Sequence, residues 1–252
     1  MPIIGVINQK GGVGKTTTAV NLSAALAERR RILLADLDPQ ANASSGVGVT
    51  APESTVYDVI AGRSSARNAI CATAIDNLHL LAASADLAGL QVEVDAGKEN
   101  MRLLARGLTG VRPNYDFIIV DAPPSMGMLT LNAMAAADLL IVPLQTEYYA
   151  LEGIASMMDT VERVKGSFNP DLRILGILLT MYDGRTRLSQ EVEANVREHF
   201  GELVFKTIIP RTVRLAEAPS YGQSVLEYAP SSQGATAYRE LAEEVIQRVS
   251  EA

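Results

Sequence analysis

The sequence is poor in the residues that form crosslinks or hold soft metals. Among its 252 residues it has one cysteine, Cys71, and two histidines, His79 and His199. One thiol makes neither an intrachain disulfide nor a four-thiolate cluster, which favours a chain kept reduced in the cytosol. Neither histidine lies in a polar motif, which argues against a zinc site or histidine acid–base catalysis. Disulfide-stabilised, iron–sulfur and zinc-dependent functions are therefore disfavoured.

Long hydrophobic runs and low-complexity tracts are also missing. No apolar stretch reaches membrane-spanning length without a charge. The segment 1–7 lacks a basic region and predicts a first strand, not a signal peptide. No Pro/Ser-rich linker or repeat divides the chain, so we expect a soluble, cytoplasmic protein with a single domain over residues 1–252. The formal net charge of −7 argues against a uniformly basic surface, although a local group of arginines can still bind an acidic polymer.

Short apolar runs alternate with helical patterns along the chain. The runs are nearly continuous, as in parallel strands covered on both faces, and they occupy residues 3–7, 32–35, 78–82, 117–120, 139–142 and 174–179. Between them, Leu22, Ala25 and Leu26 follow the spacing of an amphipathic helix, as do apolar residues at 154–161. This alternation predicts an α/β fold with a doubly wound, mostly parallel sheet flanked by helices. Ligands of such sheets collect at the carboxyl ends of the strands.

A glycine-rich loop lies between the first predicted strand and the first helix. It consists of Lys10, Gly11, Gly12, Val13, Gly14, Lys15, Thr16 and Thr17. Glycines let backbone N–H groups fold around a polyphosphate, Lys15 adds a full positive charge, and Thr16 is a ligand for Mg²⁺. The usual pattern G-x-x-x-x-G-K-[ST] has glycine at position 9, where this chain has Gln9. The additional Lys10 would repel Lys15 unless an anion separates them or Lys10 points to a different site.

Aspartates follow two further predicted strands. Asp36 and Asp38 come at alternate positions after the second strand and so face the same way, and Pro39 ends that strand. Asp121 follows the strand at 117–120. Beside a phosphate loop, Asp121 is predicted to hold Mg²⁺ directly or through water, and Asp36 and Asp38 to converge on the cation or the attacking water. Asp38 lies further past the strand end and is the better candidate to orient that water. The alternatives are a solvated turn at 36–38 and a helix cap at Asp121.

Together these three segments resemble the ParA/Soj-type partition ATPases, a deviant branch of the P-loop NTPases that also includes MinD and the nitrogenase iron protein. The resemblance covers nearly the whole chain and extends to residues 178–186 and 208–220. It implies a weak Mg²⁺-dependent ATPase that binds ATP and ADP and closes into a nucleotide-sandwich homodimer with ATP. Lys10 matches the signature lysine, which in this family crosses to the partner's phosphates. The resemblance also places Met181, Pro210 and Thr212 at the nucleotide, the last two near adenine.

The resemblance implies partners as well. In this family the ATP-bound dimer binds double-stranded DNA without sequence preference, which associates it with the nucleoid, and a ParB-type centromere-binding protein stimulates hydrolysis and release. Arg185 and Arg214 match DNA-contacting positions of relatives, and Arg187, Lys206 and Arg211 extend the predicted patch. A dimer presents every cation twice, so a few arginines suffice for salt-sensitive binding by an acidic protein. The alternative is that they form solvated pairs with Glu191, Glu193, Glu198 and Glu202.

A membrane-positioning ATPase like MinD is the main alternative function, because it shares the loop and both aspartate segments. Such a protein needs a basic amphipathic helix at the C-terminus. The last predicted helix has an apolar side between Ala237 and Val249, but Glu240, Glu243, Glu244 and Glu251 would oppose binding to anionic lipid. We therefore expect the apolar side to pack against the sheet, and no membrane partner.

Overall fold

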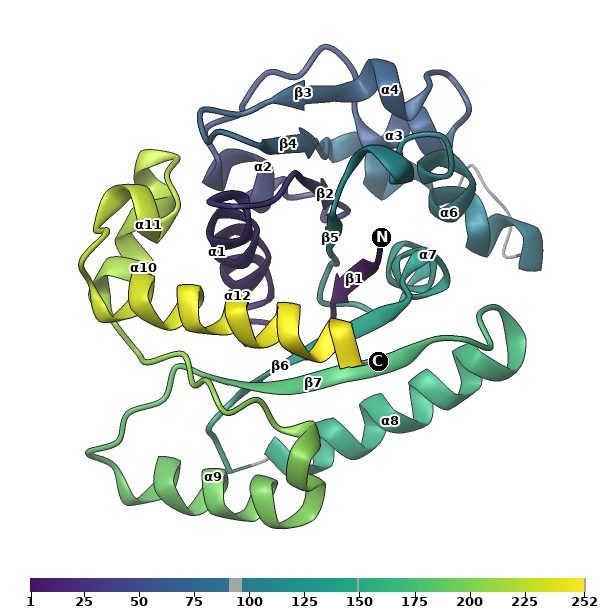
Figure 1. Ribbon diagram of the computed structural model, residues 1–252. Helices are drawn as coiled ribbons and strands as arrows, with labels where there is room; N and C mark the ends of the chain where they lie inside the picture. Colours follow the sequence, from purple (N-terminus) through teal and green to yellow (C-terminus); the bar gives the residue numbers. More distant parts are fainter. Residues whose placement is uncertain (91–96, 149, 252) are drawn as a thin grey trace.

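A seven-stranded sheet lies at the centre of the computed structural model, which describes residues 1–90, 97–148 and 150–251 (Figure 1). The strands are β1 (Ile3–Val6), β2 (Ile32–Asp36), β3 (Ile70–Ala72), β4 (Leu78–Leu81), β5 (Phe117–Asp121), β6 (Leu139–Gln145) and β7 (Arg173–Thr180). Their order in the sheet is β3-β4-β2-β5-β1-β6-β7, and every described pairing is parallel except that of β3 with β4. The predicted doubly wound, mostly parallel sheet is confirmed. The short antiparallel β3 is an addition to the predicted strands.

Five longer helices cover the sheet, and short helical turns connect the other elements. The longer ones are α1 (Lys15–Ala27), α7 (Met128–Ala136), α8 (Ala150–Ser167), α9 (Arg187–Phe200) and α12 (Gln233–Glu251). The shorter α-helices are α2 (Asn42–Gly46), α3 (Val56–Ile60), α4 (Ala66–Ala69), α6 (Leu103–Leu108), α10 (Val213–Glu217) and α11 (Val225–Tyr228). The 3₁₀ turns are η1 (Ala85–Gly89), η2 (Lys98–Arg102), η3 (Arg112–Asn114), η4 (Gly201–Leu203) and η5 (Ala218–Tyr221). Within the described ranges, no helix is both long enough and apolar enough to cross a bilayer.

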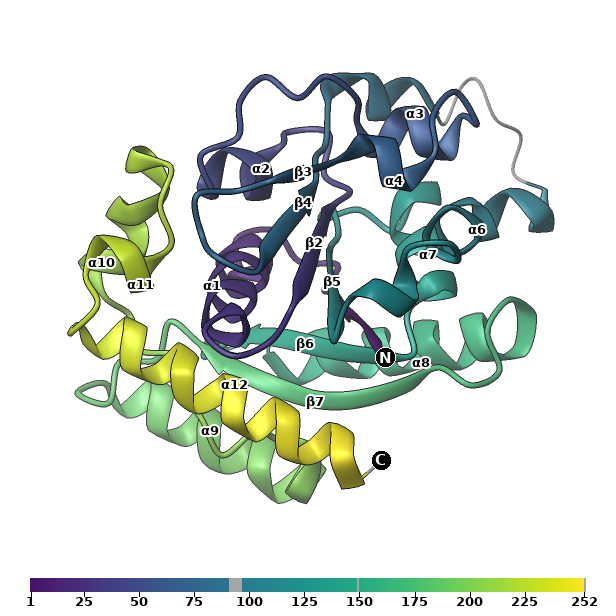
Figure 2. The same cartoon turned by 45° about the horizontal axis from the view of Figure 1, so that its top comes forward.

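Alternate residues of the central strands enter two separate cores. In β2, Leu33 and Ala35 belong to the same buried cluster as side chains of α7 and α8, whereas Ile32 and Leu34 belong to the same cluster as side chains of α1 and α12. Figure 2 shows the helices on the two sides of the sheet. The strands are therefore buried on both faces, which explains their nearly continuous apolar sequence. The apolar side of α12 packs onto the sheet as predicted, with Leu241 fully buried. The carboxyl ends of the parallel strands, where the predicted site residues lie, share one edge of the sheet.

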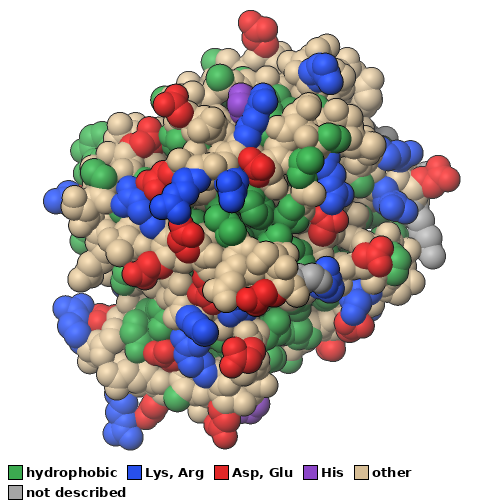
Figure 3. All heavy atoms as spheres, in the orientation of Figure 1, with side chains coloured by type: hydrophobic (Ala, Val, Ile, Leu, Met, Phe, Trp, Pro, Cys, Tyr) green, Lys and Arg blue, Asp and Glu red, His purple; other side chains and the backbone are tan. Residues whose placement is uncertain are grey.

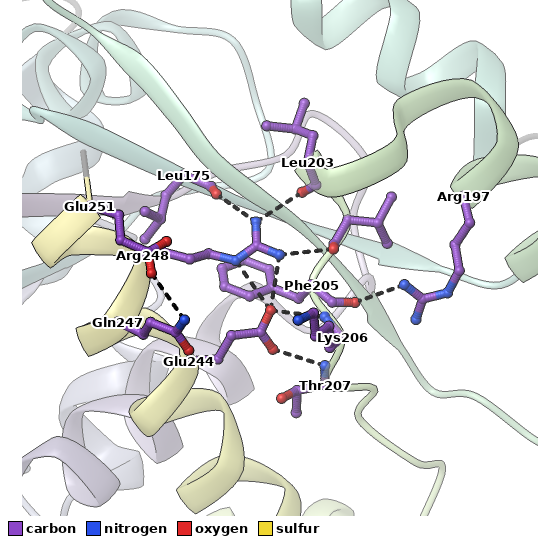
Figure 4. A network of polar contacts seen from close by, with 11 residues as sticks. Leu175, Arg197, Leu203, Phe205, Lys206, Thr207, Glu244, Gln247, Arg248 and Glu251 are labelled. Carbon is purple, nitrogen blue, oxygen red and sulfur yellow. Dashed lines mark hydrogen bonds and ion pairs between the residues drawn. The ribbon is translucent and has the colours of Figure 1, made fainter.

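Charged side chains of both signs are mixed on the face of the molecule shown in Figure 3. A largely buried ion pair lies near the end of α12. Arg248 of α12 forms an ion pair with Glu244 at 2.9 Å, and its guanidinium donates to the carbonyls of Leu175 and Val204 at 3.1 and 2.9 Å (Figure 4). The same guanidinium lies 4.3 Å from the centre of the Phe205 ring. Glu244 thus contributes to packing between α12 and β7 and does not face solvent as the sequence suggested.

Candidate nucleotide-binding site

The glycine-rich loop joins β1 to α1 and leaves the N-terminus of α1 open. Gly12 and Gly14 have φ angles of 76° and 87°, which favour glycine. Helix α1 has no side-chain cap and no acidic residue in its first turn. Its first backbone N–H groups and the positive end of its dipole are therefore available to an anion. This geometry supports the phosphate site predicted at residues 10–17.

The two lysines of this loop have different surroundings. Lys15 is 6% exposed, and its Nζ donates to the Lys10 carbonyl at 3.0 Å. Burial lowers the pKa of Lys15, while the charges of Asp121 and Asp38 oppose that shift. The Lys10 side chain is half-exposed, and its Nζ lies 2.7 Å from a carboxylate oxygen of Glu147, just past the end of β6. The two cations avoid repulsion because Lys15 lies inside the site and Lys10 is held by an acidic residue at the surface.

The three predicted aspartates meet at the carboxyl edge of the sheet. Asp36 and Asp121 are paired in register on β2 and β5, and both are fully buried. Asp36 accepts hydrogen bonds from the Asp38 N–H at 3.0 Å and from the N–H and hydroxyl of Ser44 at 2.8 Å each. Asp38 is 8% exposed and accepts from the Gln40 N–H at 3.0 Å. Neither alternative is seen. Asp36 and Asp38 are buried and so do not form a solvated turn, and α7 begins without a side-chain cap, so Asp121 does not cap that helix.

Asp121 is the best candidate for a cation ligand. Both of its carboxylate oxygens are buried and have no hydrogen-bond partner among the described residues. Burial raises the pKa of Asp121 well above its ordinary value and the Asp36 charge adds to this, while Thr16 and Lys15 oppose it without satisfying either oxygen. Mg²⁺ suits such a site, since it binds one or two protein oxygens and takes phosphates and water for the rest. The described part of the chain has no cluster of three His, Cys, Asp or Glu side chains suited to a metal, so a nucleotide would complete the shell.

The buried Asp36 carboxyl should make the free energy of unfolding depend on pH. Burial raises its pKa to about 6, against the opposing hydrogen bonds from Ser44 and Asp38. The folded state therefore binds this proton more tightly than the unfolded chain. The resulting stabilisation is complete below about pH 4 and is lost as the pH rises through about 6. Relative to Asp36→Asn, the wild type should lose on the order of 2 kcal/mol of unfolding free energy between these values.

This difference is measured by urea titration of both proteins without nucleotide or Mg²⁺. The exposed turn residue Asp76 supplies the control, because Asp76→Asn should follow the wild type at every pH. A constant difference between Asp36→Asn and the wild type from pH 4 to about pH 7 would contradict the prediction.

A cavity of about 710 Å³ opens beside the phosphate loop. Among the residues that line it are five that the sequence assigned to the nucleotide: Gly14, Thr17, Met181, Pro210 and Thr212. The Thr180 hydroxyl donates to the Val13 carbonyl at 2.8 Å and so ties the end of β7 to the loop. Met181 follows with a φ of 51°, in the left-handed region. The volume suits a small-molecule ligand whose phosphates reach the loop.

The cations predicted to bind DNA do not form a single patch. Arg185 and Arg211 line the nucleotide cavity, and Arg214 follows nearby on α10. Lys206 instead lies in a groove with Arg248, at the other end of β7 (Figure 4). The segment 204–211 runs parallel to β7, with Val204 paired to Ile177 in the middle of the strand and Pro210 paired to Tyr182 just past its end. Contact of Lys206 with DNA stays a prediction, although this residue lines a different groove from Arg185 and Arg211.

Carboxylates accompany the exposed arginines of this region. The pairs are Arg185–Asp183 at 2.8 Å, Arg187–Glu191 at 2.7 Å and Arg214–Glu217 at 3.0 Å. These arginines thus do form solvated ion pairs, as the alternative expected. Of the four glutamates named for it, only Glu191 pairs with one of these three arginines. Exposed pairs are worth at most about 1 kcal/mol, so exchange of a carboxylate for a phosphate has a small cost. Contact with DNA stays a prediction.

The first 174 residues match a family model described as an AAA domain. The chain is 54% identical to the chromosome-partitioning ATPase Soj of Thermus thermophilus over 250 residues, which are 99% of this chain and 97% of that protein. The chain belongs to the Soj/ParA family of chromosome-partitioning ATPases. It is also 48% identical to the sporulation initiation inhibitor protein Soj of Bacillus subtilis, over 96% of this chain and 97% of that one.

A solved structure agrees with this family assignment. The cobyrinic acid a,c-diamide synthase of Mycobacterium smegmatis, with bound ADP and magnesium, superposes with a TM-score of 0.86 and 37% identity. The match covers 99% of this chain and 96% of that one. The P-loop NTPase fold expected from the resemblance is therefore confirmed, together with membership of an ATPase family.

Three side chains at the candidate site were not predicted from the sequence. Asn8 is buried, donates to a carbonyl of β6 at 2.7 Å and accepts from the Lys10 N–H at 2.9 Å, which fixes the start of the loop. Glu147 holds the Lys10 side chain. Tyr238 lines the cavity from α12, with its hydroxyl 3.3 Å from that of Thr18. Asn8 and Glu147 follow strand ends and so carried a usable signal, whereas Tyr238 comes from a distant helix and had none.

Proposed function

We propose that this protein is a partition ATPase that uses ATP and Mg²⁺ to switch between a monomer and a DNA-bound sandwich dimer. Lys15 and the loop N–H groups hold the phosphates, and Thr16 and Asp121 hold Mg²⁺, which neutralises phosphate charge during transfer. Asp38 orients the attacking water. A ParB-type partner stimulates hydrolysis, which returns the dimer to monomers and releases the bound DNA; the cargo to be partitioned is a chromosome or a plasmid.

One observation carries this proposal: the loop has two lysines, and only Lys15 is directed into its own site. Lys10 is half-exposed, and its contact with Glu147 is an exposed ion pair with side chains 51% and 47% accessible. Such a pair breaks at little cost. Lys10 is then available to the phosphates of a second copy of the chain, where a second positive charge is favourable.

Two other functions receive less support. The identity to the two Soj proteins, 54% and 48%, exceeds the 37% identity to the diamide synthase. A MinD-like membrane role would require the apolar side of α12 to face lipid, whereas this side packs on the sheet and Glu240 and Glu243 lie exposed on the helix. Co-sedimentation with anionic vesicles in ATP would support that second role.

Gel filtration and DNA retention with ADP and with ATP test the proposal. ATP should convert the wild type to a dimer that binds nonspecific duplex DNA, and Lys10→Ala should bind ATP yet remain a monomer that does not bind DNA. Glu147→Ala is the matched control, because it removes the other half of the ion pair and leaves Lys10 free to dimerise. An ATP-saturated wild type that stays monomeric would contradict the proposal.

Arg214→Ala should weaken DNA retention about tenfold or more without changing ATP affinity, because each arginine that contacts phosphate in the dimer is lost twice. Arg185→Ala should weaken retention similarly, but Arg214 is the cleaner test since Arg185 also lines the nucleotide cavity. Retention is compared at low and high salt. Equal retention of variant and wild type at both would remove these arginines from the interface.

A further inference from the structure

A short helical segment beside α1 carries unusual exposed side chains. This segment, residues 213–228, comprises α10, η5 and α11 and is called the arm below (Figures 1 and 2). Among the described residues, five large apolar side chains are exposed, and two of them belong to the arm: Val213 at 70% and Tyr221 at 66%. Exposed tyrosine close to arginine is typical of binding interfaces.

The exposed tyrosine is held in a defined position. The Tyr221 ring stacks on Tyr228 with centroids 4.9 Å apart and planes inclined by 23°. The Arg214 guanidinium lies 6.0 Å from the centre of the Tyr228 ring and 3.0 Å from a carboxylate oxygen of Glu217, which also accepts from the Tyr228 hydroxyl at 3.2 Å. In the described ranges the Tyr221 hydroxyl itself makes no hydrogen bond. Tyr221 and Arg214 thus both contact the Tyr228 ring, which places a hydroxyl donor and a guanidinium on the same part of the arm.

Arginines lie where the arm begins. Arg185, Arg211 and Val213 line one cavity, so the arm begins where this row of arginines ends. Asp183 neutralises Arg185 and Glu217 neutralises Arg214. No ion pair of Arg211 is present in the part of the chain that the structure describes, so this guanidinium is available to an anion, while the exposed Glu227 at the far end of the arm balances its charge. Arginine guanidinium and tyrosine hydroxyl groups are both common donors to DNA phosphates.

The arm contacts α1, which follows the phosphate loop, and the residues just after α2, which follows the aspartate segment at 36–38. The Asn21 side chain in α1 accepts from the Val225 N–H at 2.7 Å. Gly222, with φ 64°, touches Gly48 after α2 so closely that a Cβ on Gly222 would lie 3.1 Å from the Gly48 Cα. Helix α1 begins at Lys15, and α2 follows the aspartate segment. These contacts hold the tyrosine rigidly relative to the site, as a preorganised interface requires.

We propose that Tyr221 contacts the DNA backbone directly, with its hydroxyl donating to a phosphate oxygen next to the phosphate bound by Arg214. Tyr228 positions Tyr221 through the ring stack, and it positions Arg214 through the contact with its ring and the shared Glu217 carboxylate. This inference rests on the DNA binding proposed above and adds a neutral contact to a surface otherwise made of arginines.

Salt-dependent binding of a nonspecific DNA duplex in ATP tests the inference. Tyr221→Phe and Tyr221→Ala should each weaken binding about tenfold, since the dimer loses two hydrogen bonds to charged phosphates. The slope of log K against log salt should stay at the wild-type value, because no cation is lost. Arg214→Ala is the matched comparison, and its slope should be shallower by about 1.8 for two phosphate contacts per dimer. ATP turnover without DNA and thermal stability should be unchanged in the Tyr221 variants.

Two results would overturn the inference. Wild-type affinity of Tyr221→Phe would exclude the hydroxyl contact. A shallower slope for Tyr221→Ala, equal to that of Arg214→Ala, would show that the tyrosine only positions the arginine. By contrast, a wild type that does not bind DNA in ATP contradicts the proposed function itself, before any variant is compared.

Discussion

Replacing Asp38 by alanine should lower the rate of ATP turnover by at least about 100-fold, the usual range for loss of a group that assists proton transfer or orients the attacking water. Asp38 is 8% exposed and close enough to Lys15 for its charge to oppose the lowering of the Lys15 pKa by burial. In the proposed site the loop and Lys15 bind the phosphates, so the affinity for ATP should change little. The measurement is phosphate release at saturating ATP, together with ATP affinity by equilibrium titration.

The structure suggests two companions for this variant. Asp38→Asn retains an oxygen that accepts from the Gln40 N–H, so it keeps the local fold and removes only the charge. It should be as slow as Asp38→Ala. Asp76→Ala removes an exposed aspartate from the turn before β4 and should keep full turnover. Normal turnover in Asp38→Ala would reject the catalytic role.

Slow hydrolysis has a consequence for assembly. If turnover is what ends the dimeric state, Asp38→Ala in ATP should remain dimeric and bound to DNA long after the wild type has dissociated. Gel filtration and DNA retention over time distinguish this result from a simple binding defect. If Asp38→Ala binds ATP normally but is monomeric, then turnover is not what ends the dimeric state.

The central strands and the phosphate loop were predictable because their signals are local. A strand buried on both faces needs a continuous apolar run, and each run ends where a polar residue reaches the edge of the sheet, as at Asp36 and Asp121. The antiparallel β3 was not predictable, since Ile70–Ala72 is too short for a periodic pattern and lies at the sheet edge. Its position depends on pairing with β4.

The contacts that sequence reasoning missed join residues far apart in the chain. Lys10 and Glu147 are separated by 137 positions, and the Gly48–Gly222 contact depends on backbone path alone. Lys206 shows the same limit, because it lines a different groove from Arg211 despite its nearness in sequence. Chemistry at one strand end can thus be predicted from local pattern, whereas partners across elements require the packed fold.

The ion pair between Arg248 and Glu244 illustrates such packing. Their side chains are 17% and 12% exposed, and the Glu244 carboxylate also accepts from the N–H groups of Lys206 and Thr207 at 2.8 and 2.9 Å. The Phe205 ring is fully buried beneath the guanidinium. One residue of α12 therefore fixes the segment that runs along β7 toward the nucleotide cavity.

Arg248→Ala should lower the free energy of unfolding by about 3 kcal/mol, because it leaves a largely buried carboxylate without its partner and removes donors from the Leu175 and Val204 carbonyls. The matched control is Arg29→Ala, whose ion pair with Glu243 has side chains 72% and 62% exposed and should contribute at most about 1 kcal/mol. Urea titrations of the three proteins measure both differences. Equal losses in the two variants would show that solvent reaches the Arg248 pair as freely as the surface pair.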